Sequence, residues 1–207
     1  MNWFRYSSPQ TFFPLAGTLA RVCAVAAALL AAAGLYIGFF VAPTDAQQGE
    51  AYRIIFIHVP AAWMSMFIYV VMACWAALGL AFNTRLSGMM AQALAPTGAL
   101  FTFIALQAAI DDPRRADRAG ALLAIVGVVN IPIIYYSVQW WNTLHQGASV
   151  SLKSSPKMAA TMLTGMLLMA LAFWMYSIAA SLLRVRSIIL ERERNADWVR
   201  EWRGGTA

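Results

Sequence analysis

Charged residues are scarce in this 207-residue sequence, and five long stretches contain none. Asp, Glu, Lys and Arg make up 12% of the residues, against roughly a quarter in a soluble domain. Each stretch is long enough to cross the hydrocarbon core, which takes about 20 helical residues. The sequence therefore predicts an all-α, polytopic membrane helical bundle. The five apolar segments cover residues 22–42, 58–82, 89–110, 119–138 and 158–183.

Cysteine and the usual enzyme signatures are also scarce or missing. The two cysteines, Cys23 and Cys74, both lie in apolar segments, so no disulfide framework is expected. No C-x-x-C-H motif is present to attach haem through thioethers. The apolar segments contain no paired carboxylates, no glycine-rich phosphate loop and no H-E-x-x-H motif. We therefore expect no enzymatic activity and no catalytic residues.

The distribution of basic residues indicates membrane topology. The net charge is +6, and all 15 Lys and Arg lie in the loops and tails that flank the apolar segments. This pattern predicts orientation by the positive-inside rule and does not predict nucleic-acid binding. We expect a cytoplasmic tail at 1–21, a transmembrane domain at 22–183 and a cytoplasmic amphipathic tail at 184–207. The first apolar segment is interpreted as a retained anchor because it exceeds the usual length of a signal-peptide core.

The C-terminal tail carries two tryptophans, Trp198 and Trp202, four residues apart. This spacing places both on one face of a helix. Two interpretations remain open: a helix lying on the membrane surface, or a helix that docks on a partner subunit.

The loop charges conflict with a simple count of five spans. Arg85 makes the loop at 83–88 a cytoplasmic turn, and three arginines favour the same side for the loop at 111–118. A single span at 89–110 cannot join two loops on one side. Three explanations are open: a re-entrant third segment, an inverted half of the protein, or a missing span near 106–110. We favour the missing span.

Two histidines, His58 and His145, lie beside ends of the apolar segments. They are either amphipathic residues of the membrane interface or axial ligands that bind haem iron through neutral imidazole nitrogens. Paired ligation requires both histidines on one side of the membrane. With five strict spans they would lie on opposite sides, so the topology decides whether this site can exist.

Aromatic residues precede the second histidine. Trp140 and Trp141, with Tyr135 and Tyr136, end the fourth apolar segment. Such clusters are typical of interfacial aromatic belts, and the alternative is a flat apolar platform for a porphyrin. Asn130 within that segment is interpreted as a hydrogen-bonding partner of a neighbouring helix.

Three blocks resemble the haem exporter protein C (CcmC) family of cytochrome c maturation. They are RIIFIHVPAAW at 53–63, DDPRRADR at 111–118, and NIPII with SVQWWNTLHQG within 130–147. The resemblance implies a six-span protein of the bacterial inner membrane that holds haem non-covalently and transiently on the periplasmic face. It further implies transfer to a haem chaperone, beside an ABC-type ATPase and small membrane subunits. His58 and His145 match the family histidines proposed as axial haem ligands.

The chain departs from the family pattern at one place. The tryptophan-rich segment ending in Trp-Asp, and the span that follows it, are absent between 106 and 111. This is the place where the loop charges also require another crossing. Haem handling is therefore the predicted function, with two alternatives: a truncated, inactive structural subunit of the same complex, or a small transporter subunit for another solute.

Overall fold

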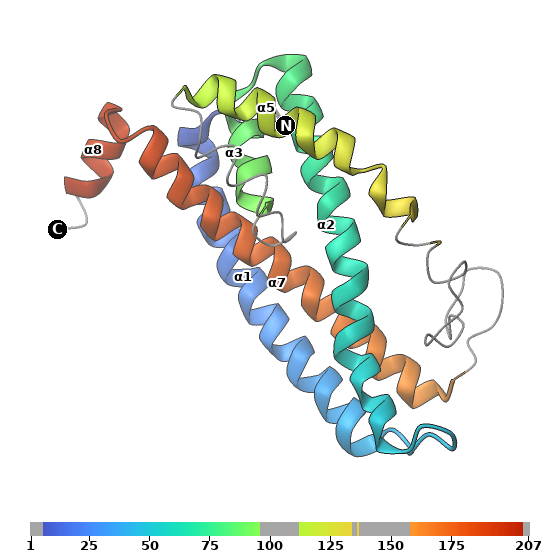
Figure 1. Ribbon diagram of the computed structural model, residues 1–207. Helices are drawn as coiled ribbons and strands as arrows, with labels where there is room; N and C mark the ends of the chain where they lie inside the picture. Colours follow the sequence, from blue (N-terminus) through green and yellow to red (C-terminus); the bar gives the residue numbers. More distant parts are fainter. Residues whose placement is uncertain (1–5, 96–111, 134–135, 137–157, 205–207) are drawn as a thin grey trace.

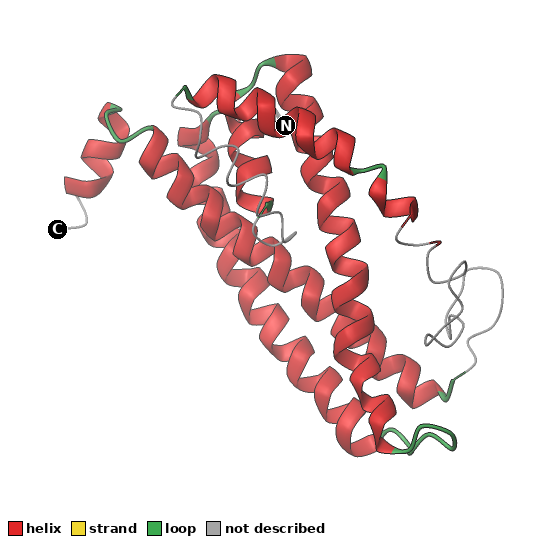
Figure 2. Cartoon of the chain, in the orientation of Figure 1, coloured by secondary structure: helices red, strands yellow, loops and turns green. Residues whose placement is uncertain are grey.

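The structure, a computed structural model, describes residues 6–95, 112–133, 136 and 158–204 (Figure 2). These residues form helices joined by short loops, and they contain no β-strand, which confirms the all-α prediction. The elements are α1 (Pro9–Tyr36), η2 (Ile37–Val41, π-helical), η3 (Glu50–Ile54, 3-10), α2 (Ile55–Phe82), α3 (Arg85–Leu94), α5 (Pro113–Gly127), α7 (Ala160–Arg192) and α8 (Asp197–Gly204).

Four helical segments among the described residues are long and apolar enough to cross a membrane. They are Pro9–Val41, Glu50–Phe82, Pro113–Ile133 and Ala160–Arg192. They coincide with four of the five predicted apolar segments, so the chain is a multi-pass membrane protein. In the remaining segment, predicted at 89–110, α3 ends at Leu94, and residues 96–110 lie outside the described residues.

The most extensive helix pair joins α1 to α7, the first and the last of the long helices (Figure 1). Small residues let the two backbones approach closely, as is common between membrane helices. A Cβ on Gly34 would lie 2.8 Å from Cγ of Met169, and one on Gly17 would overlap the Arg186 guanidinium. The contact therefore depends on glycine at position 34, where the Met169 backbone nitrogen would also lie 3.1 Å from the added Cβ, whereas at Gly17 the flexible end of Arg186 can move aside.

Helix α5 runs antiparallel to α2. Ala121, midway along α5, shares a buried cluster with Ala76, toward the end of α2. Further along α5, Gly127 lies under the hydroxyl of Tyr69, where any Cβ would overlap the oxygen. The N-terminus of α5 is well defined by its sequence. Pro113 occupies the first turn, and the side chain of the N-cap residue Asp112 accepts a hydrogen bond from the Arg114 amide at 2.9 Å.

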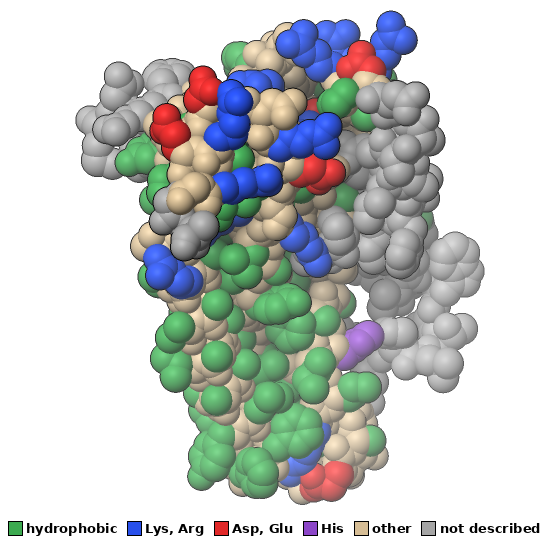
Figure 3. Space-filling view, turned by 90° about the vertical axis from the view of Figure 1, so that its left-hand side faces the viewer, with side chains coloured by type: hydrophobic (Ala, Val, Ile, Leu, Met, Phe, Trp, Pro, Cys, Tyr) green, Lys and Arg blue, Asp and Glu red, His purple; other side chains and the backbone are tan. Residues whose placement is uncertain are grey.

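Ion pairs gather three distant parts of the chain at one end of the bundle, which we call the arginine-rich end (Figure 3). Both guanidinium Nη atoms of Arg192 bind the Asp117 carboxylate, at 2.7 and 2.9 Å, and Nη2 also donates to Gln92 at 2.7 Å. Glu193 follows on α7 and pairs with Arg85 at 3.3 Å. The start of α3, the start of α5 and the end of α7 therefore lie together.

Helix α8 folds back onto the start of α1. The indole N–H of Trp198 donates to Glu193 at 3.0 Å. The rings of Trp198 and Trp202 lie 5.8 and 5.2 Å from that of Phe13, measured between centroids. The shared tryptophan face predicted from the four-residue spacing therefore covers a side chain of the same protein. The Arg186 guanidinium lies on the Phe13 ring as well, 4.2 Å from its centroid.

The other end of the bundle, which we call the histidine end, comprises the loop at 42–54 and the starts of α2 and α7. Phe56 of α2 and Met162 of α7 belong to one buried cluster there. The four long helices thus alternate in direction between the two ends (Figure 1). Helices α3 and α5 both begin at the arginine-rich end, and the predicted span at 89–110 lies for the most part outside the described residues.

Candidate functional site

His58 lies in the second turn of α2 at the histidine end, and its side chain is exposed (Figure 3). It follows the 3-10 turn η3, which runs directly into the helix. The neighbouring side chains of Ile54 and Ile57 are exposed and apolar. An accessible imidazole beside aliphatic surface suits axial ligation of an iron porphyrin, since the ring needs a nitrogen donor and an apolar face.

Arg53 ties the backbone before His58 to the end of α1. Its Nη1 donates to the Gly38 carbonyl at 2.5 Å and to the Ala42 carbonyl at 3.4 Å. Its Nε binds the Glu50 carboxylate, and its side chain is only 16% exposed. The π-helical turn η2 places these carbonyls where a guanidinium can reach them, and such turns are frequent at functional positions. The start of α2 is therefore fixed to α1 through backbone acceptors.

Glycine packing fixes the same region from the inside. A Cβ on Gly38 would lie 2.6 Å from Cδ2 of Phe56, and a Cβ on Gly165 would lie 3.2 Å from Cε1 of the same ring. Phe56 is fully buried at this crossing of α1, α2 and α7. Pro60, one helical turn further along, has no N–H to donate to the Phe56 carbonyl. His58 thus projects from a helix start whose inner face is tightly packed.

The position of His58 on the helix directs it toward the side occupied by α5. His58, Ser65 and Tyr69 follow one another at spacings of seven and four residues, which places them on one stripe of α2. Farther along that stripe, the Tyr69 hydroxyl covers Gly127 of α5. The chain that leaves α5 therefore starts on the side of α2 that carries His58.

The other predicted site residues, Trp140, Trp141 and His145, lie outside the described residues. They belong to the connection between α5 and α7. Helix α5 points away from the arginine-rich end, and α7 begins beside Phe56 at the histidine end.

The loop at 42–49 borders the site and is ordered by Asp45. One oxygen of Asp45, Oδ1, accepts hydrogen bonds from the backbone amides of Gln47 and Gln48, at 2.9 and 2.8 Å. The amide of Gln48, followed by that of Gln47, holds the pKa of the Asp45 carboxyl below its usual value. Gly49 has a φ of +60°, a conformation that glycine adopts most easily.

Sequence reasoning identified His58 but missed the role of Arg53. The positive-inside rule counts an arginine only as a loop charge, whereas Arg53 stands in the same block as His58 and binds two carbonyls. Asn130, interpreted as a helix-bonding residue, is exposed. Among the described residues, no group of three or more His, Cys, Asp or Glu side chains could hold a metal ion.

Comparison with known proteins gives a consistent match. The family model described as "Heme exporter protein C" matches residues 2–108 and 103–200. Three relatives carry that name. The protein of Escherichia coli (strain K12) is 36% identical over 231 residues, covering 93% of each chain. That of Bradyrhizobium diazoefficiens is 38% identical, covering 93% of this chain and 87% of its own. That of Haemophilus influenzae is 32% identical, covering 94% of each.

The matches also divide where the sequence predicted an interruption. The two pieces matched by the family model meet at residues 103–108. The alignment to the Escherichia coli protein spans 231 residues, more than the 207 of this chain. The relative therefore contains residues that have no counterpart here.

Proposed function

The chain belongs to the haem exporter protein C family, and from this membership we propose that it acts in haem export for cytochrome c biogenesis. In this proposal His58 and His145 ligate the haem iron, and Trp140 and Trp141 line the porphyrin. Haem is the cargo, held non-covalently while no bond of the porphyrin is made or broken. The described residues that support this are the exposed His58 and its rigid surroundings.

One observation carries the proposal: His58 and the first turn of α7 lie at the same end of the bundle. The chain between α5 and α7, which contains His145, therefore connects toward the end that carries His58. This arrangement permits two imidazoles to approach one iron.

The membrane location and the partners follow from the same premise. We propose that the arginine-rich end faces the cytoplasm of a bacterial inner membrane, as the positive-inside rule favours. The histidine end then faces the periplasm, where a haem chaperone would receive the cargo. An ABC-type ATPase and small membrane subunits would act beside this chain. These partners are inferred from membership of the family and are expectations for this protein.

Haem binding tests the proposal directly. The purified full chain is titrated with haem in detergent, and the Soret absorbance is recorded for the parent, His58→Ala and His145→Ala. We expect each histidine variant to lose the six-coordinate spectrum. Ser65→Ala is the matched control, since Ser65 is exposed on the same stripe and bonds only locally, to the Ala62 carbonyl at 2.9 Å. Unchanged spectra in both histidine variants would refute paired ligation.

Imidazole rescue separates ligation from structural damage. Free imidazole added to His58→Ala should restore the spectrum if the side chain acts as a ligand, because the small molecule supplies the missing nitrogen donor. Cysteine accessibility labelling near residues 58, 115 and 145, with Cys23 and Cys74 replaced, tests the sidedness separately. Labelling of 58 and 145 from opposite sides would exclude the bis-histidine site.

A second candidate is a structural subunit that no longer binds haem, favoured by the division of the family match at 103–108. This protein would associate with its partner subunits and remain colourless. Co-purification without Soret absorbance, combined with histidine variants that behave as the parent, would support it.

A further inference from the structure

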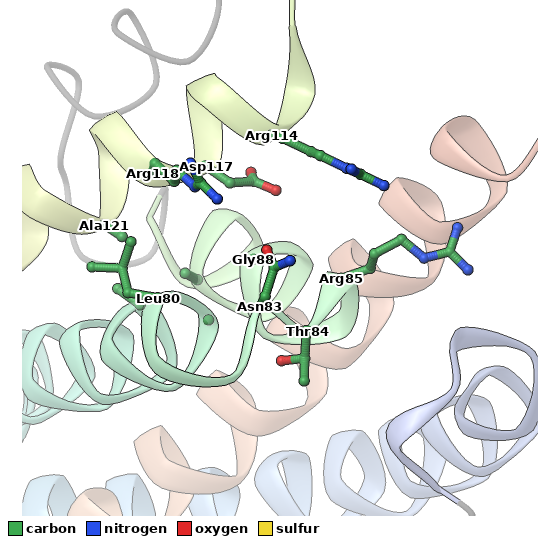
Figure 4. Close-up of a pocket in the computed structure, with 12 residues that line it drawn as sticks. Leu80, Asn83, Thr84, Arg85, Gly88, Arg114, Asp117, Arg118 and Ala121 are labelled. Carbon is green, nitrogen blue, oxygen red and sulfur yellow. The ribbon is translucent and has the colours of Figure 1, made fainter.

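A small polar cavity opens at the arginine-rich end, between the end of α2 and the starts of α3 and α5 (Figure 4). Its volume is about 90 Å³. Since a water occupies about 30 Å³ of liquid volume, the cavity has room for a tetrahedral anion or a few waters. Its walls are built from small residues, which leave the hollow open: Ala76, Gly79, Gly88, Ala91 and Ala121.

The lining of this cavity is positively charged. Three arginines, Arg85, Arg114 and Arg118, are among its lining residues, and Asp117 is the one acidic residue of the lining; Figure 4 shows the Arg85 side chain extending away from Gly88. The Asp117 carboxylate is already neutralised, because Arg192 binds both of its oxygens. Figure 4 shows Arg118 and Asp117 on α5 above Gly88 and Asn83.

The arginines of α5 remain available to a ligand. Arg114 and Arg118 are exposed, and neither forms an ion pair with a described residue. Arg85 is 68% exposed, and its partner Glu193 is shared with the Trp198 indole. A guanidinium group can bind two oxygens of a phosphate at once through parallel N–H donors.

Below the polar rim the surface becomes apolar. Leu80, which lines the cavity, is exposed, and so are Phe82 and Leu122 on either side. The rim of the cavity thus offers positive charge beside aliphatic side chains, an arrangement that fits a lipid headgroup and its acyl chains.

We propose that this cavity binds the phosphate group of an anionic phospholipid, with Arg114 and Arg118 as the principal ligands. Asn83 and Thr84 supply further polar groups at the rim. The acyl chains would lie along Leu80 and Leu122. The same phosphate chemistry could come from a free phosphate ion, and the absence of apolar contacts then predicts weaker binding. This site is independent of haem binding at the other end.

The test uses the full chain in detergent micelles. Phosphatidylglycerol, phosphatidylcholine or inorganic phosphate is added, and the unfolding midpoint and the lipids retained in native mass spectrometry are measured. We expect phosphatidylglycerol to raise the midpoint and to be retained, and phosphatidylcholine to do neither. A comparable effect of inorganic phosphate would keep the phosphate site and overturn the lipid assignment.

Variants then locate the binding. Arg114→Gln with Arg118→Gln should weaken phosphatidylglycerol binding roughly thirtyfold, since each interfacial arginine is worth about a five- to sixfold change in affinity. The variant with Lys at both positions should bind phosphatidylglycerol with an affinity between those of the parent and the double Gln variant. Lysine keeps the positive charge but cannot form the paired hydrogen bonds of a guanidinium group. Helix content and the lipid-free midpoint check that both double variants are folded.

The matched control removes the same charge elsewhere. Arg200→Gln with Arg203→Gln lies on α8, away from the cavity, and should leave lipid retention unchanged. An equal loss in this control would mean that net charge alone attracts the lipid, and the site would be refuted. Retention by the α5 double variant at parent level would refute it as well.

Discussion

The two ends of the bundle are held by different chemistry. At the arginine-rich end, side chains bind side chains from distant parts of the sequence, as in Arg192 with Asp117 and Gln92. At the histidine end, Arg53 binds backbone carbonyls, and glycines press against Phe56. The first arrangement fixes the order of the helices. The second fixes the start of the helix that carries the exposed His58 against α1 and α7.

The largest effect should come from filling the glycine contact at the histidine end. Gly38→Val would place its first added atom 2.6 Å from the Phe56 ring, and we expect a destabilisation of about 3 kcal/mol. The measurement is unfolding of the purified protein in mixed micelles. Ala33→Val on the exposed side of α1 is the control and should be nearly neutral. Equal midpoints for the two variants would contradict the tight crossing.

Removing the Arg53 contacts should lower the free energy of unfolding somewhat less than Gly38→Val does. Arg53→Met keeps the length of the side chain but leaves the Gly38 carbonyl without its charged donor, so we expect about 2 kcal/mol. Haem titration of the same variant should also show weaker binding, because the start of α2 loosens. Glu50→Gln changes only the exposed partner of the pair, 62% accessible, and should lower the stability much less than Arg53→Met. A larger effect of Glu50→Gln than of Arg53→Met would reverse this assignment.

Substitution at the arginine-rich end should lower the stability of the protein without changing haem binding. Asp117→Asn weakens a bidentate pair whose side chains are 20% and 21% exposed, and we expect about 1–2 kcal/mol after allowing for solvent. Haem absorbance should remain at the parent level. A double-mutant cycle with Arg192→Gln measures the coupling of the pair. A loss of haem binding in Asp117→Asn would show that the two ends are not independent.

The smallest effect concerns the loop beside the site. Asp45 has a lowered pKa, so its contribution to loop order is present above the unfolded pKa of about 3.9 and is lost as the pH falls through the lower folded value. Nuclear magnetic resonance shifts of the Gln47 and Gln48 amides should titrate with a midpoint below 3.9 or so. Asp45→Ala should abolish this titration. A midpoint at or above the ordinary value would contradict the two hydrogen bonds.

The hydropathy pattern predicted which segments form membrane-crossing helices but did not predict the residues at which these helices begin and end. Four uncharged segments became long helices because a backbone in lipid must close its own hydrogen bonds. Helix α1 nevertheless begins at Pro9 and α7 continues to Arg192, beyond the predicted limits of 22 and 183. These extensions are set by packing of Phe13, Val185 and their neighbours in one buried cluster, which a count of apolar residues cannot register.

The candidate site was predictable in part. The three sequence blocks predicted the family, which the family match confirms, whereas the role of His58 as a haem ligand stays a prediction. The Arg53 contact with α1 was not predictable, because it depends on the π-helical turn that presents the Gly38 carbonyl. Likewise, the spacing of Trp198 and Trp202 predicted a shared face, but the sequence does not state that the face covers Phe13.

The pairing of α1 with α7 has a consequence for biosynthesis. The helix that leaves the ribosome earliest finds its main partner only when the last long helix has been made. At about 5–20 residues per second, the interval is on the order of ten seconds. Throughout it, the glycine-lined face of α1 is covered by lipid or by a temporary companion. The contact between α1 and α7 therefore forms only after α7 has been synthesised and inserted, so the helix bundle is completed at the end of translation.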